Sequence, residues 1–470
     1  MSDTLDPKNW DDFRQSAHTM LDAALDKMQS ASDGPVWQPL PADMKSRFNV
    51  PLPAKGANIT DTLSALLPYG VGNTHPRFFG WVHGAGTPTG VIADIAAGAM
   101  NANLGGRDHG AMYVEKQVVA WVRQMFDFPE TASGLIVSGT SMATIIALKV
   151  ARDARLDFAS RTGGIGGGIG GCKLVGYTSE QAHTCVARAF DILGLGSDAL
   201  RIIAVNTDYT MDIDALQSAI DTDRAAGLIP FFVAGTAGTV NTGAIDNLAA
   251  LADTAAAENL WLHVDGAFGA TAILSPDLKP KLRGINRADS IAFDFHKWLH
   301  VNYDAGFVLI RDEALHRAAF SLRPEYLREG AALAAGNPWP VEYGPELSRT
   351  NRALKIWAQF TAHGTEALAA AIARNCTQAQ TLAGLIVAEP SLQLCAPVSL
   401  NIVCFSVPDP AQNADIVAKL QTSGIAAPST TMLQDESAIR VNLTNHRTQD
   451  ADLALLVRAV VEISAGLTSQ

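Results

Sequence analysis

From Leu135 to Ile310, short apolar runs alternate with longer segments of helical periodicity. The runs read LIVSG, KLVGYTS, RIIAV, IPFFVAG, LWLHVD, SIAFD and GFVLI. A segment such as TSMATIIALKVARDARL, in which apolar residues recur every three to four positions, separates each of the first four runs from the next. This spacing is typical of a mostly parallel sheet with helices on both faces. We therefore predict an α/β fold whose ligands bind beyond the carboxyl ends of the strands.

The chain on either side of this region has a different pattern. Residues 10–28 carry apolar side chains on one helical face, and a Pro/Gly-rich stretch follows over 34–53. We predict that residues 1–75 form an N-terminal helical arm, too small to fold alone, that packs on the body or on a second subunit. Residues 76–365 are predicted to form the large domain, and residues 366–470 a small α+β C-terminal domain.

Composition excludes several classes of protein. The 35 basic and 47 acidic side chains give a net charge of −12, and no Lys/Arg cluster is visible, which argues against nucleic acid or an anionic membrane as partner. Apolar residues make up 48% and charged residues 17%, as in a globular protein with a large core. The acidic start of the chain and the absence of a long apolar run lead us to expect a cytoplasmic protein. The five cysteines lack CxxC spacing and are interpreted as buried, reduced thiols.

A glycine-rich segment, GGIGGGIGG, spans 163–171. It contains a GxGxxG match at Gly166, Gly168 and Gly171, but a strand follows it, whereas a dinucleotide-binding loop requires a helix there. We interpret the segment as a surface linker.

Polar side chains follow several of the predicted strands. Ser138-Gly139-Thr140-Ser141 stands where a long helix begins, and hydroxyl residues at such a place either cap the helix or help its N–H groups to hold a phosphate. His183 follows the run KLVGYTS and is either a structural residue or a catalyst.

Two further positions carry charged groups. Asp265 closes the run LWLHVD, and a carboxylate there needs a metal, a strong donor or the protonated nitrogen of a heterocycle. Lys297 lies in DFHKWL among apolar neighbours, which favours an amine of lowered pKa suited to a Schiff base, although a surface lysine beside a structural Trp has the same local sequence. A segment poor in periodicity, 328–344, follows Arg323-Pro324-Glu325-Tyr326-Leu327 and is predicted to be a lid.

A phosphate cradle, an imidazole that can stack, a buried Asp and a Schiff-base Lys together meet the requirements of pyridoxal phosphate (PLP), in which the Asp keeps the pyridine nitrogen protonated. A metallohydrolase that uses His263, Asp265, His296 and His300 is the alternative of another class. HKWLH lacks the Glu of an HExxH site, so we expect no metal.

The segments SGTSMATIIAL, SEQAHTCVARA, GTVNTGAID, HVDGAFG and FDFHKWLHVNYD, in this order, make the chain resemble the group II PLP-dependent amino-acid decarboxylases, such as aromatic-L-amino-acid decarboxylase. The resemblance runs from about Trp10 to Gly364 and more faintly to the end. It implies a PLP-dependent transferase fold like that of aspartate aminotransferase (fold type I). It also implies a homodimer with active sites at the subunit interface, which would give the N-terminal arm a partner.

The resemblance implies a role for each site residue. Lys297 would form the internal aldimine, Asp265 would pair with the pyridinium nitrogen, and His183 would stack on the ring. The phosphate would be bound by Thr140 and Ser141 with His296 nearby, and Ala267 would complete the cofactor-binding positions.

The resemblance also bears on the reaction. Tyr326 matches the loop tyrosine that returns a proton to the substrate α-carbon after the quinonoid forms, which favours decarboxylation to an amine and CO2. An aldehyde-forming enzyme or another carbon-carbon lyase of the same fold is the alternative.

The substrate side chain is less defined by the sequence. One segment that lines the pocket in this family contains Trp81 and His83, and another contains Asn103 and Arg107. The substrate is therefore expected to be either an aromatic amino acid or a polar or acidic one. Asp294 stands where the family commonly has a neutral polar residue. Because a carboxylate beside a phosphate is unfavourable, we predict that Asp294 points away or accepts a neighbouring donor.

Overall fold

The computed structural model describes residues 4–165, 173–322 and 337–468. Its larger sheet has seven strands in the order β1-β7-β6-β5-β4-β2-β3. In chain order these are β1 (Ser133–Val137), β2 (Leu174–Ser179), β3 (Leu200–Ile203), β4 (Ile229–Thr236), β5 (Trp261–Asp265), β6 (Ser290–Asp294) and β7 (Gly306–Ile310). The pairs that involve β7 are antiparallel and the others are parallel. The predicted α/β fold with a mostly parallel sheet is confirmed.

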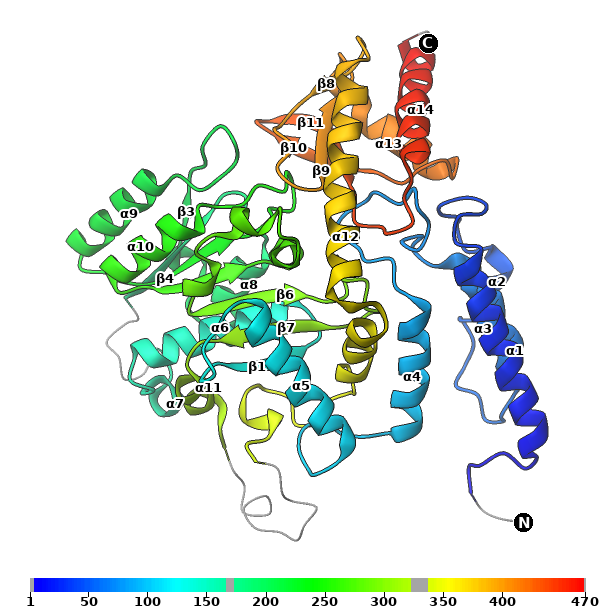
Figure 1. The fold of residues 1–470 in the computed structure, drawn as a ribbon, viewed down its shortest axis with the longest axis horizontal. Coiled ribbons are helices and arrows are strands. Elements are labelled where there is room, and N and C mark those ends of the chain that lie inside the picture. Colours follow the sequence, from blue (N-terminus) through cyan, green and yellow to red (C-terminus); the bar gives the residue numbers. More distant parts are fainter. Residues whose placement is uncertain (1–3, 166–172, 323–336, 469–470) are drawn as a thin grey trace.

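Helices cover both faces of this sheet (Figure 1). One face packs against α5 (Gly110–Met125), α9 (Ile213–Ala225), α10 (Leu248–Glu258) and the first part of α12 (Ala353–Val387). The other face packs against α6 (Thr140–Arg155), α8 (Cys185–Ile192) and α11 (Glu313–Phe320). A four-residue helix, α7 (Ser160–Gly163), follows α6.

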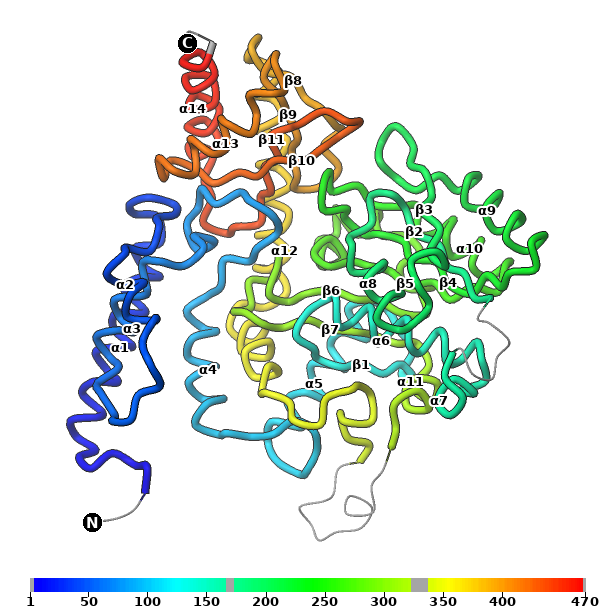
Figure 2. The backbone as a smooth tube through the Cα atoms, turned by 180° about the vertical axis from the view of Figure 1, so that it is seen from behind, coloured from blue at the N-terminus to red at the C-terminus, as the bar shows by residue number. Residues whose placement is uncertain are grey.

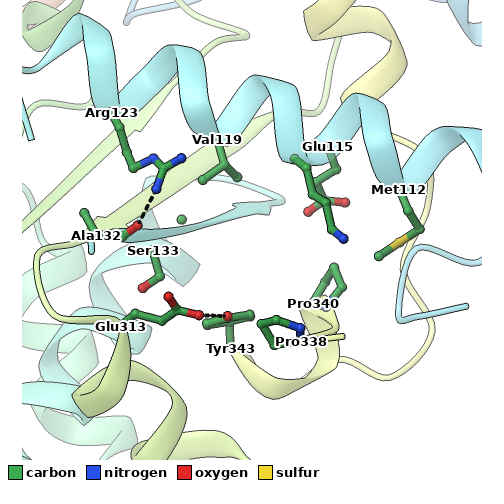
Figure 3. Close-up of a pocket in the computed structure, with 12 residues that line it drawn as sticks. Met112, Glu115, Val119, Arg123, Ala132, Ser133, Glu313, Pro338, Pro340 and Tyr343 are labelled. Atoms are coloured by element: carbon green, nitrogen blue, oxygen red, sulfur yellow. Dashed lines mark hydrogen bonds between the residues drawn. The ribbon is translucent and has the colours of Figure 1, made fainter. Parts of the chain in front are cut away.

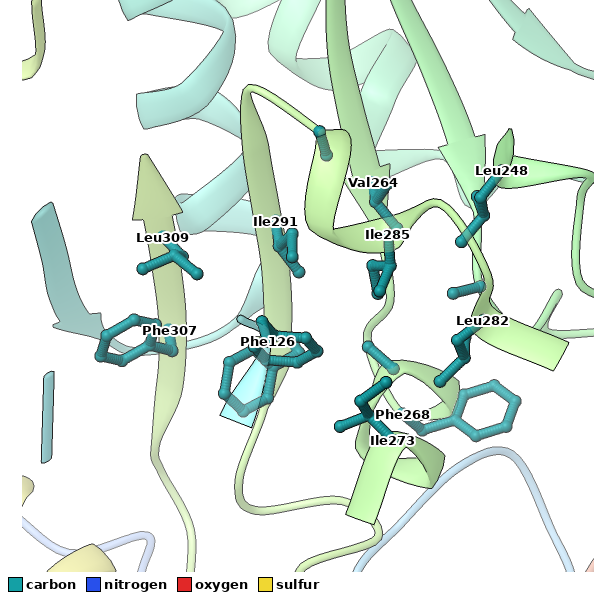
Figure 4. Packing of buried hydrophobic residues seen from close by; sticks show 14 of the residues in the cluster. Phe126, Leu248, Val264, Phe268, Ile273, Leu282, Ile285, Ile291, Phe307 and Leu309 are labelled. Carbon is teal, nitrogen blue, oxygen red and sulfur yellow. The ribbon is translucent and has the colours of Figure 1, made fainter. Parts of the chain in front are cut away.

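Alternating apolar side chains divide the core between the two faces. Val264, Ile291 and Leu309 point to the same face from three neighbouring strands (Figure 4). Ala292 and Val308 join the cluster on the opposite face. Central strands must be apolar on both faces, which explains why each one was visible in the sequence as a continuous apolar run.

The C-terminal part of the chain forms a second, antiparallel sheet in the order β10-β11-β9-β8. Its strands are β8 (Gln393–Leu394), β9 (Ile402–Ser406), β10 (Ser429–Leu433) and β11 (Glu436–Asn442), and it packs with α13 (Asn413–Thr422), α14 (Asp450–Thr468) and the second part of α12. A kink at Gly364, whose φ is 70°, divides α12 close to the predicted boundary at 365. The exact domain limits remain a prediction.

The N-terminal arm lies along one side of the molecule (Figure 2). It contains α1 (Trp10–Gln29), α2 (Ala42–Ser46) and α3 (Thr60–Leu66), and α4 (Pro88–Met100) follows. None of the residues of α1 is buried, and Trp10 and Phe13 are more than half exposed. The helix predicted over 10–28 is therefore present, but its apolar face is only partly covered within one chain, where α1 packs against α3.

Some predicted features cannot be compared with the structure. Most of the glycine-rich linker and the segment 323–336, with Tyr326 and much of the predicted lid, lie outside the described residues. Helices α4 and α5 were not predicted, although α4 begins with Pro88 and ends before the left-handed Asn101, and α5 buries Ala111, Val118 and Val122 along one face. Within the described part of the chain, every helix is too short or too polar to cross a bilayer.

Candidate active site

The carboxyl ends of β4, β5 and β6 meet at a cavity of about 250 Å³, where the fold predicts a ligand. Asp265 is the last residue of β5, and Lys297 follows the end of β6 by three residues. The cavity is lined by Trp81, Val82, His83, His183, Thr236, Gly238, Val240, Asp265, Ala267, Phe268 and Lys297. Six of the residues predicted from sequence thus meet there: Trp81, His83, His183, Asp265, Ala267 and Lys297.

Asp265 is 3% exposed and its two oxygens have different partners. Oδ1 accepts the backbone N–H of Ala267 at 3.1 Å, and Oδ2 accepts the thiol of Cys185 at 3.4 Å. Burial, followed by the charge of Asp265, raises the pKa of the Cys185 thiol far above its usual value, so the thiol keeps its proton and donates it. Sequence reasoning gave Cys185 no such role, because cysteine is common in apolar cores.

A chain of buried hydrogen bonds continues behind Cys185. Thr144 Oγ1 lies 4.0 Å from Cys185 Sγ and 3.4 Å from His263 Nε2. His263 Nδ1 lies 2.9 Å from Ser290 Oγ, which itself accepts from Trp261 Nε1. Burial lowers the pKa of His263 to about 4, so this imidazole is neutral and links two strands to α6. We therefore interpret His263 as structural.

Lys297 and the start of α6 are connected by Asp294. Asp294 Oδ2 lies 3.2 Å from Lys297 Nζ and 3.7 Å from His296 Nε2. Its Oδ1 accepts the backbone N–H of Thr140, the first residue of α6, at 2.7 Å. As predicted, Asp294 accepts a neighbouring donor. His296 Nδ1 accepts the N–H of Ala305, and burial lowers the pKa of His296.

Trp81 and His83 line the cavity, and an aromatic cluster continues from His83 through Tyr303 to His296. The ring of His83 lies 5.9 Å from that of Trp81 and 5.8 Å from that of Tyr303, and Tyr303 lies 4.3 Å from His296. Burial raises the pKa of Tyr303 to about 12. Desolvation lowers the pKa of His183, whose Nδ1 accepts the N–H of Cys185. Sequence reasoning missed Tyr303, which follows the site lysine by six residues in NYD.

Arg440 holds two walls of the cavity in place from the C-terminal sheet. It is 3% exposed and donates to the carbonyls of Val240 at 2.6 Å and Trp81 at 3.0 Å. Trp81 has a φ of 47°, so this bond supports a left-handed backbone conformation. The sequence separation of 359 positions between Trp81 and Arg440 explains why sequence reasoning did not connect them.

Some of the predicted site residues do not line this cavity. Asn103 Oδ1 accepts the N–H groups of Gly105 and Arg349, and Asn103 lines a separate cavity. Arg107 lies over the ring of Trp339 at 5.0 Å. Ser141 follows Thr140 in α6 but does not line the 250 Å³ cavity.

Another cavity, of about 290 Å³, lies between α5 and residues 338–343 (Figure 3). Its polar groups already have partners: Glu313 accepts the hydroxyl of Tyr343, and Glu115 is paired with Arg349. We therefore assign it no chemistry.

The donor set of the site fits PLP. Thr140 Oγ1 is buried at the start of α6 without a hydrogen-bond partner among the described residues, which suits a phosphate oxygen. Asp265 offers a buried carboxylate to a protonated ring nitrogen, and Lys297 offers an amine to an aldehyde. Across residues 4–165, 173–322 and 337–468, no three His, Cys, Asp or Glu side chains are grouped as metal ligands.

Comparison with known proteins agrees with this chemistry. The model of the pyridoxal-dependent decarboxylase conserved domain matches residues 41–408. An aromatic-L-amino-acid decarboxylase of Bacillus atrophaeus is 33% identical over 96% of this chain and 95% of the relative. A phenylacetaldehyde synthase of Arabidopsis thaliana is 27% identical over 85% of this chain and 84% of the relative. The solved structure of Oryza sativa TDC with PLP and tryptamine has a TM-score of 0.89 at 25% identity and covers 98% of this chain and 100% of that chain.

The family match covers most of the chain, and its cofactor is the one that the site fits. The chain therefore belongs to the group II pyridoxal-dependent decarboxylases, which are PLP-dependent amino-acid carboxy-lyases.

Proposed function

We propose that the protein decarboxylates an aromatic L-amino acid to the corresponding amine and CO2. The observation that carries this choice is an aromatic cluster at the cavity: Trp81 and His83 line it together with Lys297, and Tyr303 packs against His83. Such rings can stack with a flat side chain. Arg107, which favoured an acidic substrate at the level of sequence, stacks on Trp339. The similarity to an aromatic-L-amino-acid decarboxylase supports the same choice.

Each predicted cofactor residue has a defined task in this proposal. When bound, PLP accepts the electron pair left at the α-carbon as CO2 departs. Lys297 supplies the amine for the cofactor's aldehyde, and Asp265 holds a proton at the ring nitrogen. His183 stacks on the ring face, while Thr140, Ser141, Ala267 and His296 form the rest of the cofactor site.

The fate of the α-carbon decides between amine and aldehyde. We assign the return of the proton to Tyr326, which favours the amine. The similarity to a phenylacetaldehyde synthase makes an aldehyde-forming enzyme the second candidate. The two candidates differ in products, because the aldehyde route consumes O2 and water and releases ammonia and hydrogen peroxide together with the aldehyde and CO2.

We also propose a homodimer with active sites at the subunit interface. The exposed Trp10 and Phe13 of α1 support it, as do the exposed Ile92, Ile95 and Met100 of α4. Replacing Trp10 and Phe13 by Ser should shift sedimentation toward the monomer, while the exposed Met432, replaced in the same way, should not. A wild-type monomer at micromolar concentration would contradict the proposal.

The test of the function is a product assay. Tyr, DOPA, Trp, Phe, Asp and Glu are offered to the holoenzyme, and CO2, amine, aldehyde and oxygen uptake are measured. We expect kcat/KM to be highest for an aromatic substrate and one amine to form for each CO2. Lys297→Ala should abolish turnover, whereas Arg107→Ala should leave the order of preference unchanged. A preference for Asp or Glu would refute the aromatic assignment, and equal amounts of aldehyde and CO2 would support the second candidate.

A further inference from the structure

The place where a phosphate would meet the start of α6 contains a carboxylate of the chain itself. Asp294 is 2% exposed, and its Oδ1 lies 2.7 Å from the N–H nitrogen of Thr140. Its Oδ2 lies 3.2 Å from Lys297 Nζ. Asp294 thus occupies one donor of the helix start and pairs with the amine that holds the cofactor.

This helix start has the features of an anion site. The helix is 16 residues long, and its N-cap, Gly139, has no side chain to cap the free N–H groups. Thr140 is 5% exposed, and its hydroxyl has no partner among the described residues. A Cβ on Gly139 would lie 3.7 Å from both Asp294 Oδ1 and His296 Cε1, so the carboxylate and the imidazole flank the start of the helix closely.

The Thr140 N–H cannot donate a strong hydrogen bond to a phosphate and to the Asp294 carboxylate at the same time. Both groups are anionic, and like charges at contact distance in a buried site repel each other. His296 does not neutralise the second charge, because burial lowers its pKa and keeps the ring neutral. Lys297 is the cation that pairs with Asp294, and the cofactor's aldehyde requires the same amine.

We propose that Asp294 is an internal occupant of the phosphate site, which the phosphate of PLP must displace from Thr140 N–H when the cofactor binds. The proposal rests on the PLP dependence of the chain and on no particular substrate. In the apoenzyme, Asp294 therefore pairs with the N–H at the helix start and with Lys297. The affinity for PLP is then lower than it would be with a neutral residue at position 294. Pyridoxal, which has no phosphate, should not meet this competition.

The experiment compares cofactor binding in apoenzyme variants. PLP and pyridoxal are titrated into wild type and Asp294→Asn by absorbance and protein fluorescence, and inorganic phosphate is used as a competitor of PLP. We expect Asp294→Asn to tighten PLP and phosphate binding by about tenfold or more, given a like-charge repulsion at close range. Pyridoxal affinity should change by less than about twofold, because the repulsion acts on the phosphate alone.

The matched control is Asp312→Asn. Asp312 also accepts a helix N–H, that of Leu315 at the start of α11, but it lies apart from the cavity. It should leave PLP and phosphate affinities unchanged. Asp294→Ser, which is neutral and shorter, provides the same comparison if Asp294→Asn does not fold.

Two results would overturn the proposal. Weaker PLP binding in both neutral variants would mean that Asp294 helps to hold the phosphate. An equal gain for PLP and pyridoxal would mean that Asp294 acts through Lys297 alone. Neither readout requires turnover, so failure here is separate from failure of the proposed substrate.

Discussion

The thiol of Cys185 gives the site carboxylate a donor that is neutral at physiological pH. In the proposed function, Asp265 stays charged in order to hold a proton on a ring nitrogen, and a second positive group beside it would compete for that charge. A protonated thiol avoids the competition, because it orients Oδ2 without adding charge. Cys185 is thus a positioning residue for Asp265.

Removing this donor should change catalysis without removing the cofactor. Cys185→Ala leaves Asp265 Oδ2 without the thiol, and we expect kcat to fall by about tenfold, the order of one buried hydrogen bond to a charged group. Cys185→Ser should restore most of the rate. The pH titration of the bound cofactor's visible absorption band should shift in the Ala variant only, and identical titrations in all three proteins would show that Cys185 is merely packing.

Asp265 itself should have a larger effect. Asp265→Asn keeps the shape but removes the charge, so we expect kcat to fall by about 10²- to 10³-fold, as when one electrostatic group is lost from an active site. Asp265→Glu should be milder, because it retains the charge. Steady-state kinetics with PLP in excess measure the effect, and near-normal activity of the Asn variant would exclude the assigned role.

At the level of elements, the seven strands and the loops that carry Asp265 and Lys297 could be predicted because buried parallel strands have a strong local signal. Contacts between distant segments could not. The bond from Thr140 to Asp294 spans 154 residues, and whether β6 lies beside α6 depends on the strand order. The contact of Arg107 with the Trp339 ring could not be predicted either, and the suggested role of Arg107 toward the substrate stays a prediction.

A buried ion pair holds several elements together. Arg349, which precedes α12, pairs with Glu115 of α5 at 2.6 Å, and the two side chains are 2% and 4% exposed. Arg349 also donates to the carbonyls of Leu104 and of Ile136 in β1. Glu115→Ala leaves a buried guanidinium unpaired, and we expect the free energy of unfolding to fall by about 3–5 kcal/mol.

Urea unfolding at fixed protein concentration measures this loss. Asp253→Ala is the control, because Asp253 pairs with Arg287 on the surface and is 73% exposed, so its removal should cost far less. Equal losses of unfolding free energy in the two variants would show that the buried Glu115 pair stabilises the fold no more than a surface pair does.

For the whole molecule, buried neutral histidines set the response to acid. Burial lowers the pKa of His263 to about 4 and of His316 to about 3, from an ordinary value of 6.5. His316 bridges Ser133 of β1 and the carbonyl of Tyr343, so it is fully hydrogen-bonded in its neutral form. The pKa of Asp246 shifts in the opposite direction. Burial raises it to about 6, although the carboxylate accepts the backbone N–H groups of Met211 and Thr236.

These shifts predict how stability depends on pH. Below pH 6.5 the unfolded histidines take up protons that the folded ones do not, so stability is complete above 6.5 and falls as the pH decreases toward 4. Between pH 7.5 and 5.5, His263 and His316 should each cost about 1.4 kcal/mol, and Asp246, protonated more readily in the folded state, should return about 0.8 kcal/mol. The net loss from these three groups is about 2 kcal/mol.

Urea unfolding of wild type and His316→Gln at both pH values measures the contribution of one histidine. The variant is less stable, but its unfolding free energy should fall by about 1.4 kcal/mol less on acidification. An identical pH dependence in the two proteins would show that His316 does not stay neutral in the fold.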